Sequence, residues 1–163
     1  MPRLFSRRML VAAGGAAALA PVPFAAVGQA APRSGSLVTL LTPIRIYDSR
    51  IDIVPLGRAK LTSGTTVIVT VSVPDETRFL VAAFLNVTIT ETEGSGFLRV
   101  SGTDSSGQLP VPATSNINWS QSGQTVANLA LTTVGSEFGV DIFAGGGGRT
   151  HVIVDVQGYV PFE

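Results

Sequence analysis

The chain has 163 residues, no cysteine, and eleven acidic against eleven basic residues. A chain of this length forms one domain around a single core. The lack of cysteine excludes a disulfide framework and a cysteine nucleophile. The lack of a basic excess argues against the phosphate-neutralising surface that nucleic-acid binding requires.

The first thirty residues predict an export signal. Arg7 and Arg8 stand directly before an apolar run over residues 9–27, and small residues ending at Ala30 follow it. A charged start, an apolar middle and a small-residue exit are typical of a secretory signal, and the arginine pair indicates the twin-arginine route. We expect residues 1–30 to be removed on export. The alternative is an uncleaved anchor, since the run of about 19 residues approaches the length that spans a bilayer.

Export predicts a secreted domain at or beyond the cell surface. Removal of residues 1–30 takes away three arginines and leaves eight basic and eleven acidic residues, a formal charge of about −3. A domain of this charge is not expected to bind anionic lipid or nucleic acid through charge. No other segment is long and apolar enough to span a membrane after cleavage. We expect residues 31–36 to form a flexible leader and residues 37–163 to form one domain.

Alternating side chains predict strands along most of this domain. The alternation is clearest in residues 65–73, where valines occupy every second position, and in residues 80–91, where Val81, Leu85 and Ile89 share one side. A period of two with many β-branched residues favours strands. Further strands are expected at residues 36–41, 44–47, 97–101, 115–120, 125–134, 139–144 and 150–156.

The number and spacing of these segments predict the fold class. About nine short strands with frequent Gly and Pro turns are typical of an all-β sandwich or barrel. No capped pattern with a helical period occurs after residue 31, and four consecutive glycines at residues 145–148 predict a tight hairpin. We therefore expect an antiparallel two-sheet sandwich that resembles a jelly roll.

Few residues are suited to catalysis. The one histidine, His151, shares a strand face with Asp155, but four residues along a strand separate them by about 13–14 Å. A serine nucleophile needs a base within hydrogen-bond reach and a third group to orient that base. We therefore expect no enzymatic activity and no cofactor.

Two aspartates in one predicted loop leave a metal site open as an alternative. Asp48 and Asp52 lie four residues apart, and their carboxylates could gather oxygens for calcium. The simpler interpretation pairs Asp48 with Arg45 or Arg50, because both arginines are close in sequence.

Asparagines recur in the predicted strands, although strands disfavour them. The residues are Asn86, Asn116, Asn118 and Asn128. One interpretation is that their amides satisfy backbone groups at irregular positions. The other is a polar sheet face that binds sugar hydroxyls, with Trp119, Tyr47 and Tyr159 as candidates for aromatic stacking.

Several short segments together resemble a module common in secreted bacterial proteins. They are Thr42-Pro43-Ile44-Arg45 with Asp48-Ser49-Arg50, Leu85-Asn86-Val87-Thr88, Ala127-Asn128, and Val154-Asp155-Val156-Gln157-Gly158-Tyr159. The resemblance spans about residues 41–160. It implies a β-sandwich of largely undefined function, found in cell-surface and cell-wall-associated proteins. It supplies no catalytic residues, and Ile44 stands where many members carry a cysteine.

Two hypotheses about function follow. The first is a noncatalytic extracellular structural or adhesive module, with a second copy or a surface polymer as partner. The alternative is a carbohydrate-binding domain that recognises a cell-wall or environmental glycan.

Overall fold

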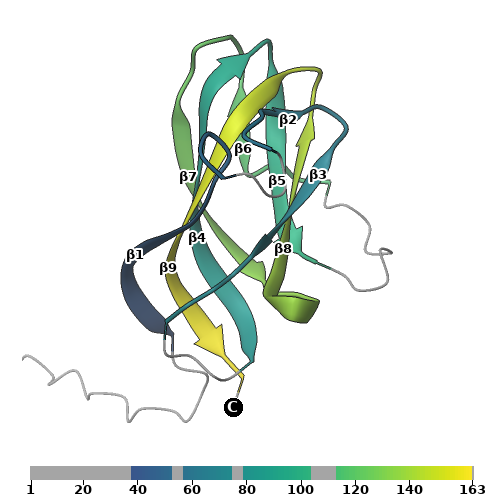
Figure 1. Ribbon diagram of the computed structural model, residues 1–163. Helices are drawn as coiled ribbons and strands as arrows, with labels where there is room; N and C mark the ends of the chain where they lie inside the picture. The colour runs from purple at the N-terminus through teal and green to yellow at the C-terminus, as the bar shows by residue number, and fades with distance from the viewer. Residues whose placement is uncertain (1–37, 53–56, 75–78, 104–112, 163) are drawn as a thin grey trace, which may run out of the picture. The chain divides into compact units, whose positions relative to one another are not determined.

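The computed structural model describes residues 38–52, 57–74, 79–103 and 113–162 (Figure 1). The predicted signal, with Arg7, Arg8 and Ala30, and the predicted leader 31–36 lie outside the described residues. Within the described ranges, no helix has the length and apolar character needed to cross a membrane.

The described residues form nine strands in two antiparallel sheets (Figure 1). The five-stranded sheet contains, in spatial order, β1 (Thr39–Asp48), β9 (Arg149–Pro161), β4 (Leu80–Glu93) and β7 (Val126–Thr133), and β2 (Leu61–Thr62) also pairs with β9. The four-stranded sheet contains, in spatial order, β3 (Thr66–Thr70), β8 (Gly139–Gly145), β5 (Gly96–Gly102) and β6 (Ile117–Trp119). A short 3₁₀ helix, η1 (Ser136–Phe138), precedes β8.

The strand order confirms the predicted all-β sandwich. When the two-residue β2 is set aside, the first sheet contains the first, eighth, third and sixth strands of the chain. The second sheet contains the second, seventh, fourth and fifth. Of the described strands, only β5 and β6 are consecutive in the chain and paired in one sheet. This is the order of a jelly roll, in which the chain repeatedly crosses between the two sheets.

The inner faces of the two sheets form one apolar core. Leu85, Val87 and Ile89 of β4 are fully buried, and the predicted alternation in β3 is confirmed because Val67 and Val69 are buried while their neighbours are exposed. Such alternation buries one side of each strand and leaves the other to solvent.

The prediction that Val81 shares the buried side of β4 is wrong. Val81 is 42% exposed, because the pairing of β4 with β9 shifts register between Leu80 and Ala82. A shift of one residue exchanges the two faces of a strand.

The two strands expected at residues 36–41 and 44–47 form one strand, β1, which runs through Pro43. β1 is an edge strand, and a proline on an edge removes no hydrogen bond from the interior of a sheet. The register of β1 against β9 does shift between Leu40 and Ile44, around the proline.

Candidate functional site

The end of β1 carries a buried carboxylate that is held by arginines. Asp48 is 1% exposed and accepts hydrogen bonds from Arg50 Nη2 at 2.6 Å and Nε at 2.9 Å. Arg45 Nη1 lies 3.5 Å from the same carboxylate, and Arg45 Nε donates to Asp155 at 2.9 Å. The Arg50 side chain holds the pKa of Asp48 below its ordinary value, so the carboxylate stays ionised. These bonds fix the turn after β1 against β9.

The same contacts show what the carboxylates of Asp48 and Asp52 bind in the structure. The carboxylate of Asp48 is occupied by arginine donors, and Asp52 Oδ2 accepts the backbone N–H of Asp48. Within the described ranges, no three His, Asp or Glu side chains lie close enough together to hold a metal ion. Pairing of Asp48 with arginine is therefore the arrangement that the structure contains.

A buried serine contacts the histidine, and the sequence did not reveal this pair. Ser49 is fully buried, and its Oγ lies 2.9 Å from His151 Nδ1 while accepting the backbone N–H of Val152 at 2.9 Å. On the far side of the ring, His151 Nε2 is 4.0 Å from a carboxylate oxygen of Glu91. Ser49 and His151 are 102 residues apart, and no local pattern links them.

This trio resembles a hydrolytic triad only in its residue types. A nucleophilic serine must be reached by substrate, but Ser49 is buried and its oxygen already binds a backbone N–H. Burial lowers the pKa of His151, which favours the neutral ring, and its Nδ1 is within hydrogen-bond distance of the Ser49 hydroxyl. Asp155 pairs with Arg45, as its predicted separation from His151 allows.

The three aromatic candidates for sugar stacking are buried. Trp119, Tyr47 and Tyr159 are 4%, 3% and 7% exposed, so none presents a ring face to solvent. The Trp119 ring packs so closely on Gly96 that a Cβ there would lie 2.4 Å from it. Burial raises the pKa of Tyr47 to about 12. Trp119 and Tyr47 thus belong to the core, which corrects their prediction as ligand residues.

The asparagines do not gather on one face. Asn128 Nδ2 donates to the Asn116 carbonyl at 2.7 Å, and the Asn116 side chain accepts a backbone N–H of β5 at 2.7 Å. For these two residues the structural interpretation is confirmed. Asn118 lies on β6 of the four-stranded sheet, whereas Asn86 lies on β4 of the other, opposite Leu129 and Asp155.

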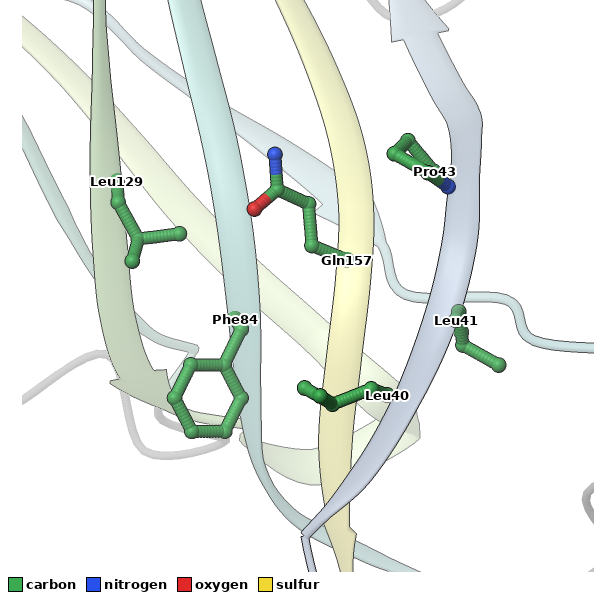
Figure 2. A pocket seen from close by; sticks show the side chains of 6 residues that line it. All are labelled: Leu40, Leu41, Pro43, Phe84, Leu129 and Gln157. Carbon is green, nitrogen blue, oxygen red and sulfur yellow. The ribbon is translucent and has the colours of Figure 1, made fainter.

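The outer face of the five-stranded sheet carries an apolar groove (Figure 2). Its volume is about 370 Å³, and it is lined by Leu40, Leu41, Pro43, Phe84, Leu129 and Gln157. These residues come from β1, β4, β7 and β9, so the groove crosses the sheet. Leu40 is 77% exposed and Leu129 is 53% exposed. Leu131, which is 63% exposed and opposite Phe84, extends the apolar surface along β7.

Sequence reasoning missed this surface. The outward positions of β4 and β7 contain both polar and large apolar residues, such as Asn86 beside Phe84. Only the register Phe84↔Leu131 and Asn86↔Leu129 brings the apolar ones together. Contiguous apolar side chains on a sheet exterior mark an interaction surface.

Comparison of the chain with protein-family models and with curated proteins found no match.

Proposed function

We propose that the domain is a noncatalytic extracellular module of structural or adhesive type, which works through the outer apolar face of its five-stranded sheet. The observation that carries this proposal is the groove, in which leucines from β1 and β7 remain exposed beside Phe84. Leucine and phenylalanine side chains gain free energy when they are removed from water. Their exposure together on one sheet face therefore indicates a surface that a partner covers.

The use of the polar residues supports a noncatalytic role. Asp48, Ser49 and His151 are all engaged with neighbours that hold β1 to β9, and Asp155 is paired with Arg45. A catalytic group needs a free position beside it for the reacting atom. These contacts instead stabilise the turn after β1.

The extracellular location is supported by the sequence. The arginine pair and apolar run of residues 1–30 predict export, and the ordered motifs resemble a module of secreted bacterial proteins. The glycan hypothesis loses its main support, because its stacking candidates are buried and the groove has one amide side chain, Gln157, among apolar neighbours.

The test is attachment after export. The full chain is expressed in a bacterium with twin-arginine export, and the fraction of exported protein that sediments with cell walls is measured. We expect the wild type to be retained, and Leu40→Lys to reduce retention by about tenfold because a charge in the groove opposes apolar contact.

Ile68→Lys is the matched control. Ile68 is 55% exposed on β3 of the other sheet, so the same substitution there should leave retention unchanged. A wild-type protein found entirely in the medium as a monomer would contradict the proposal. Equal losses in both variants would show that added charge, rather than the groove, changes retention.

A further inference from the structure

Among the described residues, no strand pairs with the outer edge of β7. In the five-stranded sheet β7 pairs with β4 alone, from Ala82↔Thr133 to Ile89↔Val126, without a register shift (Figure 1). The N–H of Val134 donates to the carbonyl of Val81, which fixes the direction of the alternation. Successive residues of an antiparallel strand direct their N–H and C=O groups to opposite sides.

This alternation identifies the four β7 residues whose backbone N–H and C=O groups point away from β4. They are Ala127, Leu129, Leu131 and Thr133. Thr133 is partly occupied, since its carbonyl accepts the Thr132 hydroxyl at 3.2 Å and lies close to Gly102 of β5. No described residue hydrogen-bonds the outward backbone groups of the other three. The open stretch is therefore 127–131, centred on Leu129.

This edge has none of the usual protection against pairing. Natural edge strands are protected by charges, prolines, bulges or short length. The β7 sequence, Val-Ala-Asn-Leu-Ala-Leu-Thr-Thr, has eight residues without charge or proline. Its outward side chains Leu129 and Leu131 are among the exposed apolar residues of the domain.

We propose that β7 pairs antiparallel with β7 of a second copy of this chain, about a two-fold axis at Leu129. The inference rests on the proposed structural or adhesive function and names its partner. In this register Leu129 faces its own counterpart, and Ala127 faces Leu131 of the other copy. Three hydrogen-bonded pairs would add about six backbone hydrogen bonds, and the two sheets become one continuous sheet.

The pairing is self-complementary, as a two-fold interface requires. A small side chain, Ala127, opposes a large one, Leu131, and no charge is brought to the axis. On β4 the residues beside this edge, Phe84, Asn86 and Thr88, are also uncharged. Phe84, the apolar residue of the three, lines the groove and would continue it across the junction.

The exposed edge strand of the other sheet fits a second copy less well. On β3, Ile68 lies directly opposite Asp141 of β8. If β3 paired antiparallel with β3 of a second copy, the Asp141 carboxylate of each copy would lie near the contact between the two Ile68 side chains. Both carboxylates would then lose part of their hydration, which is unfavourable. The uncharged surroundings of β7 favour it over β3.

Cysteine cross-linking tests the register. The chain has no cysteine, so Leu129→Cys introduces a single thiol. At the two-fold position the Cα atoms would lie about 5.5 Å apart, which a disulfide spans. We expect Leu129→Cys to form a covalent dimer under mild oxidation. In Leu131→Cys the thiols would be about 13 Å apart and should remain free. Equal cross-linking of both variants, or of neither, would overturn the proposed register.

Blocking the edge tests the backbone pairing. Ala127→Pro removes an N–H that points away from β4, so the fold should survive while the dimer dissociation constant, measured by sedimentation equilibrium, rises at least about tenfold. Ile68→Lys adds a charge on β3 of the other sheet, away from β7, and should leave that constant unchanged. Circular dichroism of each variant checks the fold.

The two proposals fail separately. Dimerisation that survives Ala127→Pro overturns the edge pairing and leaves the proposed function standing. A wild-type chain that is monomeric and yields no Leu129→Cys dimer also overturns it, even when that monomer is retained on cell walls. Loss of wall retention with an intact dimer would instead contradict the function and leave the pairing.

Discussion

The two edges of the five-stranded sheet are built in opposite ways. The β1 edge contains Pro43, exposed Arg45 and two register shifts against β9, and its end is fixed by Asp48. The β7 edge has a regular register, no charge and exposed leucines. Proline, charge and bulges are the devices by which proteins prevent strands from pairing at an edge.

Protection against pairing with a further strand is therefore confined to one edge of this sheet. Both edges border the same apolar groove, through Leu40 on β1 and Leu129 on β7. Only the β1 side carries residues that stop a further strand from adding. The proposed pairing would extend the groove across β7, whereas the features of the β1 edge oppose a further strand there.

The largest effect is expected at the fixed end of β1. Asp48→Ala removes an acceptor that is 1% exposed and serves the Arg50 side chain and backbone. Asp48 is buried whereas Arg50 is 39% exposed, so the cost comes from losing several charge-assisted hydrogen bonds to one buried acceptor. This loss should lower the free energy of unfolding by about 3 kcal/mol, measured by urea denaturation. Arg45→Ala, which removes a half-exposed partner, is the control and should cost about 0.5 kcal/mol. Equal costs would show that Asp48 does not anchor this edge.

A pair of prolines tests the direction of the β7 backbone. The backbone N–H of Asn128 points toward β4, whereas that of Ala127 points away from it. Asn128→Pro should lower the free energy of unfolding by about 2 kcal/mol because it breaks the ladder, and Ala127→Pro by less than about 1 kcal/mol. Asn128→Ala separates out the side-chain bond to the Asn116 carbonyl. A larger cost for Ala127→Pro would reverse the assignment of the open edge.

The smallest effect is a pH dependence at the β1 end. Burial lowers the pKa of His151, with Lys60 and Arg50 acting in the same direction and Glu91 and Asp48 opposing. The unfolded chain therefore binds a proton more readily than the folded one. The contribution of neutral His151 to the free energy of unfolding is fully present above about pH 6.5. It is lost as the pH falls through the lower pKa of His151 in the folded state.

Urea denaturation at pH 7.5 and pH 5 measures this loss of stability. His151→Gln removes the titrating group and should reduce the difference between the two values. A wild-type protein that becomes more stable at the lower pH would contradict the direction of the shift, provided that His151→Gln abolishes the change.

Local alternation of side chains was enough to place most strands and most of their buried sides. The alternating valines of β3 and the run from Ala83 to Ile89 of β4 predicted both, because a strand places successive side chains on opposite faces regardless of its neighbours. The all-β class followed from the number of such segments. The pairing of Asp48 with a nearby arginine was also accessible, since the residues are two positions apart.

The folded arrangement of the sheets sets which distant residues meet and which described strands lie at an edge. Ser49 reaches His151 across 102 residues, and Trp119 is buried because β6 packs over Gly96. Among the described strands, β4 is the one neighbour of β7 in the five-stranded sheet, which leaves the other edge of β7 without a strand beside it. Such facts depend on strand order and register, which arise from long-range pairing and packing of whole sheets. A local pattern of side chains carries no information about them.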